Sequence, residues 1–174
     1  MKSQKIRRMI LAAVLTALVT VATALLSIPL PTGYVHLGDG LVLLAGWMLG
    51  PVWGAAAAGL GSALADLFLG YALYAPGTFF VKALTAAVCA LTVRLLSRMT
   101  KDRTVPLLCG GTAAELIMAG GYFAYEALIL GVGAAAAASV PGNLMQGLVG
   151  LIVFVLLALL FSRYRIVDRM GREM

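Results

Sequence analysis

The chain has 174 residues, of which 62% are hydrophobic and only 11% are charged, and its net charge is +6. Soluble domains carry roughly 25% charged residues, so this composition excludes an ordinary soluble domain and indicates a polytopic membrane protein. The positive charges lie in short segments between apolar runs. They therefore do not indicate a basic face for nucleic acid.

The first apolar run follows the basic start MKSQKIRR and continues from Met9 to about Ile28. A cleaved signal peptide is the alternative interpretation, because Ala22-Thr23-Ala24 resembles a cleavage site. The run is long enough to span a bilayer, however, so we expect it to stay as the first helix. The Pro- and Gly-containing segment 29–33 is expected to end it and form a loop.

Five further apolar runs follow, and they predict an all-α fold in a single membrane domain, residues 1–174. Gly50-Pro51 separates the second run from the third, so we expect these two to form a tight hairpin. The second run has only about a dozen residues, short of the roughly 20 that span a bilayer, so it is expected to be tilted, kinked or re-entrant. The six predicted helices cover about residues 9–27, 39–50, 52–70, 76–97, 105–130 and 141–162.

Lys and Arg residues predict the orientation. With six helices and a cytoplasmic N-terminus, twelve of the thirteen fall in inside segments and none in outside loops. This asymmetry indicates that both termini are cytoplasmic, in a prokaryotic plasma membrane. The thirteenth, Lys82, lies within the fourth predicted helix. The twelve are Lys2, Lys5, Arg7, Arg8, Arg94, Arg98, Lys101, Arg103, Arg163, Arg165, Arg169 and Arg172.

Several polar side chains fall within or beside the apolar runs. An ionisable group at bilayer depth costs at least about 2.5 kcal/mol, so it usually serves a ligand or a transport path. The predicted topology places nearly all of these groups in the extracellular half, which favours a pocket for a small polar or aromatic solute. The candidate substrate-binding residues are His36, Asp39, Asp66, Tyr71, Tyr74, Lys82, Glu115, Tyr122, Glu126, Asn143 and Gln146.

Each candidate also has a structural interpretation. Lys82 and Asp66 are equally consistent with an ion pair that neutralises itself between the third and fourth helices, and this is compatible with a ligand beside the pair. His36 is equally consistent with a loop residue, and Asp39 with a helix N-cap. The tyrosines are as typical of interfacial anchors as of stacking platforms, and the two amides are typical of inter-helix hydrogen bonds. Glu115 lies deepest, and the sequence defines its role least.

Small residues at four-residue spacing predict close helix contacts. On the first helix these are Ala13 and Ala17, for which we favour a docking face for another membrane subunit over packing within the chain. On the third helix they are Gly54, Ala58, Gly61 and Ala65, for which we favour packing within the chain.

These features together resemble a known family. They are HLGDG after the Pro/Gly loop, the Gly-Pro turn, the run SALADLFLGYALYAPGTFFVKAL and the AxxxA of the first helix. The chain is similar to the substrate-binding S components of energy-coupling-factor (ECF) vitamin transporters, and most to the riboflavin-type branch associated with vitamin B6 and hydroxymethylpyrimidine. The similarity covers nearly the whole chain.

The resemblance implies a mechanism that residue spacing does not show. S components bind a micronutrient from outside, then topple in the membrane and release it inside. A separate transmembrane coupling protein and two cytoplasmic ATPases drive this step, and Ala13 and Ala17 match the motif that docks on the coupling protein. The chain lacks GxxxxGK[ST], so it is not expected to hydrolyse ATP itself.

Side-chain chemistry ranks the substrates. His, Asp, Lys and Tyr suit a heteroaromatic compound with hydroxyl groups, so vitamin B6 or hydroxymethylpyrimidine comes first and another water-soluble vitamin second. Riboflavin needs a larger, more apolar cavity. A metal substrate would need several His, whereas the chain has one.

Two other classes of function are alternatives. A self-sufficient oligomeric secondary transporter or channel would be expected to carry an inverted repeat, and none is evident. An intramembrane enzyme would need a motif such as HExxH, yet His36 is alone and Cys89 and Cys109 lack metal-ligand spacing. We therefore expect no enzyme, no cofactor and no metal site.

Overall fold

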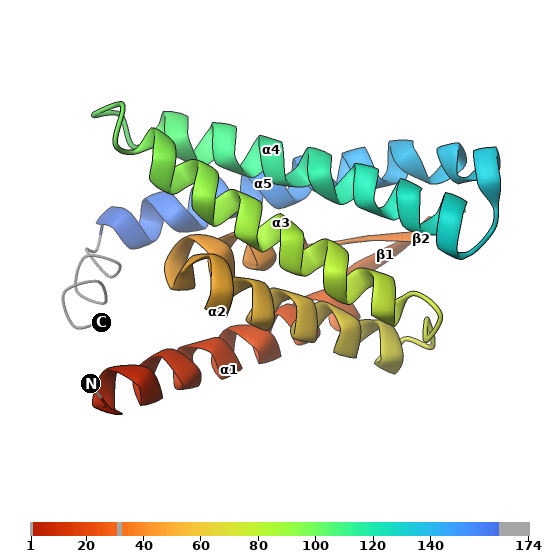
Figure 1. Cartoon of the computed structure of the whole chain (residues 1–174), viewed down its shortest axis with the longest axis horizontal. Coiled ribbons are helices and arrows are strands. Elements are labelled where there is room, and N and C mark those ends of the chain that lie inside the picture. The colour runs from red at the N-terminus through yellow and green to blue at the C-terminus, as the bar shows by residue number, and fades with distance from the viewer. Residues whose placement is uncertain (1, 31–32, 164–174) are drawn as a thin grey trace.

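The computed structural model describes residues 2–30 and 33–163. In these residues, five helices are long and apolar enough to cross a membrane. Figure 1 shows them as an elongated bundle with a small β-hairpin set into it. In chain order the elements are α1 (Lys2–Leu25), β1 (Ser27–Leu30), β2 (Gly33–His36), α2 (Gly38–Phe68), α3 (Ala75–Leu96), α4 (Thr104–Ala124), the π-helix η1 (Tyr125–Ile129), the 3-10 helix η2 (Gly133–Ser139) and α5 (Val140–Arg163).

Helix α2 contains both the second and the third predicted helices. Gly50 has φ 81° and ψ 179°, outside the helical region, and Pro51 follows it. A Cβ added to Gly54 would lie 2.6 Å from the carbonyl oxygen of Ala45, so the chain folds back on itself; an unbroken helix would separate these positions by about 13 Å. The first half, residues 38–50, is only about 20 Å long, whereas the hydrocarbon core of a bilayer is about 30 Å thick. The hairpin is present, but six separate spanning helices are not confirmed.

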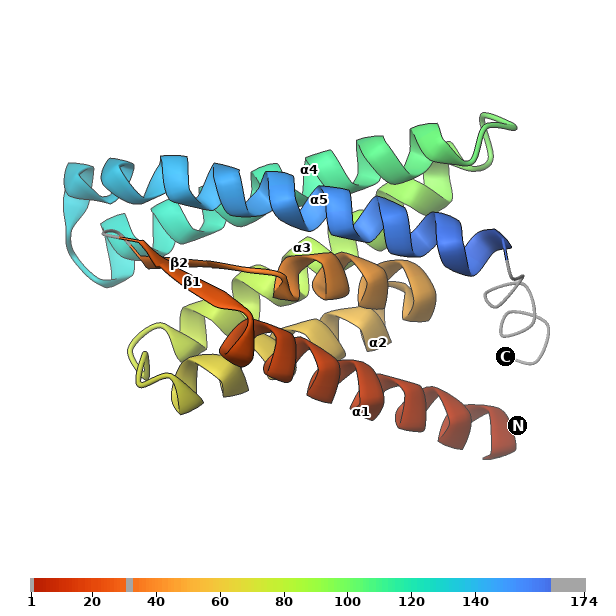
Figure 2. The same cartoon turned by 180° about the vertical axis from the view of Figure 1, so that it is seen from behind.

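The prediction that the segment between the first two helices forms a loop is wrong in detail. The segment forms an antiparallel hairpin in which Ser27 pairs with His36 and Leu30 with Gly33. The fold is therefore helical with one two-stranded hairpin. Figure 2 shows that the hairpin leads the chain from the end of α1 to the start of α2. Because the strands return the chain into the bundle, α2 begins among the other helices and its first turn is buried.

Helix α2 holds the bundle together. It packs against α1 on one side and against α3 and α5 on the other, while α4 bridges α3 and α5. The largest apolar cluster joins α2, α3, α4 and α5 through residues such as Leu43, Cys89, Leu107 and Phe154. Outside it, many large apolar side chains stay exposed, for example Phe80 and Leu128 at 70% and 78%. Such a surface is suited to lipid, and the chain is a multi-pass membrane protein.

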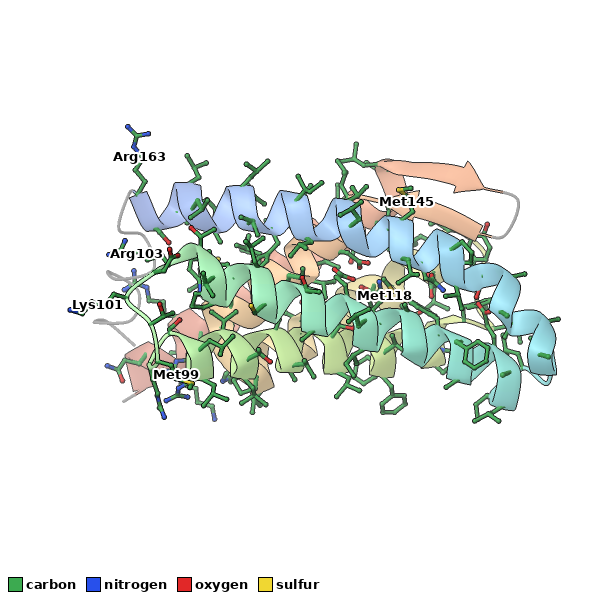
Figure 3. All side chains as sticks on the ribbon, turned by 90° about the horizontal axis from the view of Figure 1, so that it is seen from above. Met99, Lys101, Arg103, Met118, Met145 and Arg163 are labelled. Atoms are coloured by element: carbon green, nitrogen blue, oxygen red, sulfur yellow. The ribbon has the colours of Figure 1, made fainter. Side chains whose placement is uncertain are left out.

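The bundle has one basic end. Figure 3 shows Lys101, Arg103 and Arg163 at the same end, and Figure 1 places the start of α1 there too. The start of α1, the α3–α4 connection and the end of α5 therefore share one side of the molecule. That this side is cytoplasmic stays a prediction.

Two glycine variants test the packing of α2. A Cβ on Gly46 would overlap the backbone carbonyl of Ala86 in α3, whereas a Cβ on Gly120 in α4 would meet nothing within 4 Å. We expect Gly46→Ala to destabilise the protein by about 1–3 kcal/mol. The matched Gly120→Ala should be neutral or stabilising by up to about 1 kcal/mol, because alanine favours helix. Melting of both variants in detergent measures this, and an unchanged melting temperature for Gly46→Ala would contradict the close α2–α3 contact.

Candidate ligand-binding site

A buried ion pair lies at the start of α2. The Lys82 Nζ of α3 lies 2.5 Å from the Asp39 Oδ1, and the Gln146 Nε2 of α5 donates to the Asp39 Oδ2 at 2.8 Å. The side chains of Asp39 and Lys82 are 0% and 1% exposed. Three helices that are distant in sequence thus meet at one carboxylate.

Two sequence predictions are wrong here. Asp66 was the partner given to Lys82 in the structural alternative, and the structure gives that role to Asp39. Asp39 was alternatively an N-cap, but the N-cap of α2 is Leu37, and no side-chain hydrogen bond caps this end. The hairpin explains both errors, because it carries the first turn of α2 into the bundle, where Asp39 reaches α3.

An aromatic ring covers the ammonium. The Lys82 Nζ lies 5.2 Å from the ring centroid of Tyr122 in α4, a cation–π contact. The Tyr122 hydroxyl donates to the Thr78 Oγ1 at 3.1 Å. Glu115, also on α4, packs against the glycines of α5 beside Asp39. We call these five residues the polar cluster: Asp39, Lys82, Glu115, Tyr122 and Gln146.

His36 lies buried at the end of β2, next to the cluster in sequence. Its Nδ1 accepts a hydrogen bond from the Gly38 backbone N–H at 3.0 Å, so this nitrogen carries no proton. Burial lowers the pKa of His36 from 6.5 to about 4, against the opposing effect of Asp39. The imidazole is therefore neutral at pH 7 and fixes the turn between β2 and α2.

This histidine predicts a pH dependence of stability. Because its folded pKa is lower than its unfolded pKa, the unfolded state binds more protons between pH 6.5 and 4. Stability is therefore complete above about pH 6.5 and is lost as the pH falls towards 4, by at most about 3 kcal/mol. We expect His36→Gln to have a shallower loss of melting temperature between pH 7.5 and pH 5 than the wild type. Equal slopes would contradict this role of His36.

Tyr71, Tyr74 and Tyr125 form a second group at the α2–α3 connection. Tyr74 lies 6.5 Å from Tyr71 and 6.3 Å from Tyr125, measured between ring centroids. The Tyr125 hydroxyl donates to the Leu73 carbonyl at 2.7 Å. Burial, and then the carboxylate of Glu126, raise the pKa of Tyr74. These contacts hold residues 69–74 against η1, one helical turn beyond Tyr122.

The other predicted site residues lie around these two groups. Glu126 is buried and accepts a hydrogen bond from the Ser139 Oγ at 2.6 Å. Asp66 is 3% exposed, and its backbone carbonyl accepts from the Tyr71 N–H at 2.8 Å. Asn143 lies half-buried in α5. The sequence analysis missed Thr78 and Ser139. Thr78 lies one turn before Lys82 on the same helix face, so its spacing was a usable signal.

An apolar groove runs between α1 and the second half of α2. Ala13 and Ala17 are exposed and line it together with Trp53, and its volume is about 580 Å³. At the groove, α1 and α2 are in close contact, since the Thr20 Oγ1 of α1 donates to the Gly61 carbonyl of α2 at 2.9 Å. A Cβ on Gly61 would lie 2.7 Å from the Thr16 carbonyl oxygen. The small residues of α2 thus pack within the chain, while those of α1 leave a surface open.

Fold and site together define a helical membrane protein with a charged cluster enclosed between its helices, and ionisable groups buried in this way mark candidate substrate or ion sites. The profile of the family described as "ECF-type riboflavin transporter, S component" matches residues 3–163. The chain belongs to this family. It is a substrate-binding subunit of an ECF transporter, and the family is a transporter family and not an enzyme class.

Two relatives extend the comparison. The fold is similar to a structure described as "Structure and mechanism of the S component of a bacterial ECF transporter", with a TM-score of 0.68 and 25% identity over 92% of this chain and 98% of that one. An "Uncharacterized protein in gap 3'region" of Pyrococcus woesei is 32% identical over 137 residues, which are 78% of this chain and 88% of the relative.

Proposed function

We propose that the chain captures a small water-soluble vitamin or vitamin precursor from the extracellular side, with vitamin B6 or hydroxymethylpyrimidine favoured. The polar cluster is the proposed binding site, joined by His36 and the tyrosine group above it. In this proposal a separate coupling protein and two cytoplasmic ATPases drive release of the substrate into the cell.

The observation that carries the proposal is the buried Asp39–Lys82–Gln146 network. A buried ion pair is expensive to desolvate, and apolar residues of similar size often stabilise a fold as well or better. Inside a membrane this cost is difficult to explain by packing alone. A network that combines a carboxylate, an ammonium, an amide and an aromatic ring can bind a heteroaromatic solute through stacking and hydrogen bonds.

Thermal stabilisation of the purified chain tests the proposal. A ligand that binds only the folded state at 100 times its Kd stabilises that state by about 2.7 kcal/mol. We expect pyridoxine or hydroxymethylpyrimidine to raise the melting temperature, and the panel should include riboflavin, thiamin and biotin. If no compound in the panel raises the melting temperature, the proposed function is contradicted.

The groove between α1 and α2 is the proposed docking surface for the coupling protein. Ala13 and Ala17 are exposed there, and small side chains allow another helix to approach closely. Around them α1 exposes large apolar residues such as Ile10 and Val14, at 58% and 51%. A partner helix can therefore pack on this face without displacing anything from the bundle.

A further inference from the structure

Glu115 differs from the rest of the polar cluster in its hydrogen bonding. It is only 6% exposed, yet neither carboxyl oxygen has a hydrogen-bond partner among the described residues. Both oxygens of Asp39, by contrast, accept hydrogen bonds, from Lys82 and from Gln146. Buried polar atoms are nearly always paired in native proteins, so the state of this carboxyl group requires a physical explanation.

Close packing against α5 surrounds the Glu115 carboxyl group. A Cβ on Gly147 would lie 2.9 Å from the Glu115 Cβ, and a Cβ on Gly150 would lie 2.8 Å from the Glu115 Oε1. The same Gly150 Cβ would lie 2.7 Å from the Asp39 Cβ. Two acidic side chains therefore fill the space in front of one glycine, and no counter-ion can lie between them and α5.

The polar cluster has two carboxyl groups but one cation. Lys82 is the only lysine or arginine among the buried described residues, and its ammonium is paired with Asp39. His36 adds no charge at pH 7, because burial lowers its pKa to about 4. If Glu115 were ionised, the cluster would enclose one uncompensated negative charge, which is strongly unfavourable. A neutral carboxylic acid is far less costly to bury.

The groups that face Glu115 lie on all the helices packed against it. They are Asp39 of α2, Lys82 and Cys89 of α3, and Tyr122 of α4, whereas α5 presents glycines. Thiols and phenols are ordinarily neutral at pH 7, so among these groups Lys82 alone can compensate a negative charge. Asp39 and Glu115 therefore compete for one ammonium, and Asp39 holds it.

We propose that Glu115 is a proton-binding site, which holds a proton at neutral pH while Lys82 is paired with Asp39 and releases it when Asp39 leaves that pair. On release the O–H bond of Glu115 breaks, the carboxylate pairs with the Lys82 ammonium, and the proton passes to the medium. The cluster stays neutral in both arrangements. This inference goes beyond the proposed function and does not depend on which solute binds.

Infrared spectroscopy of the purified full chain tests the inference, because a protonated carboxyl group has a carbonyl stretch that a carboxylate lacks. At pH 7.5 we expect this band in the wild type and its loss in Glu115→Gln. The matched control is Asp102→Asn in the α3–α4 connection, where asparagine still accepts the bonds from Thr104 and Val105. This control should keep the band. In Asp39→Asn we expect the band to disappear, because Lys82 then pairs with Glu115.

The pH dependence of stability gives a second readout. The folded chain holds a proton that an ordinary glutamate of the unfolded chain releases above about pH 4.3. Stability therefore falls as the pH rises, by up to a factor of about ten in the folding constant for each pH unit. Glutamine cannot lose this proton, so we expect Glu115→Gln to melt increasingly above the wild type from pH 5 to pH 8. His36 titrates in both proteins, so its effect cancels from this difference.

Three results would overturn the inference. The first is an acid carbonyl band that is absent from the wild type or unchanged in Glu115→Gln. The second is a melting difference between these two proteins that stays constant from pH 5 to pH 8. The third is a band that persists in Asp39→Asn, because the two carboxyl groups would then not share Lys82. If Glu115→Gln does not fold, labelling the wild type with 13C-glutamate replaces it, and a band that fails to shift contradicts the inference.

Discussion

Replacing Lys82 with methionine is expected to abolish tight ligand binding and to destabilise the protein. The substitution leaves the Asp39 carboxylate buried and paired only with Gln146. Removing one partner of a buried charge pair costs about 3–5 kcal/mol of stability. If the ligand also contacts this ion pair, we expect the affinity of the protein for the ligand to fall by a factor of about 30 or more. Melting and calorimetric titration of the same preparation measure the two effects separately.

The double variant Asp39→Asn with Lys82→Met separates a structural ion pair from a binding site. It removes both charges, so we expect most of the lost melting temperature to return while ligand binding stays lost. Lys101→Met is the matched control, because that lysine is exposed in the α3–α4 connection, and it should change neither quantity. Recovery of binding in the double variant would show that the ion pair serves only the fold.

Replacing Ala13 and Ala17 with leucine is expected to abolish assembly with the coupling protein and to leave ligand binding intact. Both alanines are exposed on α1, so the larger side chains fill the groove without displacing the core. They would hold a partner helix away from the surface that small residues keep accessible. We expect vitamin uptake by cells to fall to background, while the purified variant keeps the wild-type melting temperature and ligand affinity.

Ala124→Leu is the control for this experiment. Ala124 is exposed at the end of α4, outside the residues that line the groove. It should support normal uptake and co-purification with the coupling protein. Normal co-purification of the Ala13→Leu, Ala17→Leu double variant would place the docking surface elsewhere.

The sequence predicted the membrane class and most helices because long apolar runs and the distribution of Lys and Arg are local signals. It could not predict the hairpin of β1 and β2, since Pro29 and Gly33 also suit an irregular loop. It did predict the turn within α2, because Gly50-Pro51 is a local signal, and Gly50 has φ 81° where the chain folds back.

The sequence named candidate site residues but not the contacts between them. Asp39, Lys82 and Gln146 were all candidates, yet their pairing depends on where the hairpin places the first turn of α2. Asp66 was considered as the partner for Lys82 because the two residues lie on consecutive predicted helices, and the sequence does not show which distant helices are in contact. The close packing of Glu115 depends on Gly147 and Gly150 of another helix, and no local pattern in α4 indicates it.

A structure of the chain with its bound vitamin tests the central claim most directly. We predict ligand density between α2, α3, α4 and α5, with ligand atoms within hydrogen-bond distance of Lys82 and Glu115. Ligand density in the apolar groove beside Ala13 and Ala17, with the Asp39–Lys82 pair unchanged and without ligand contact, would contradict it.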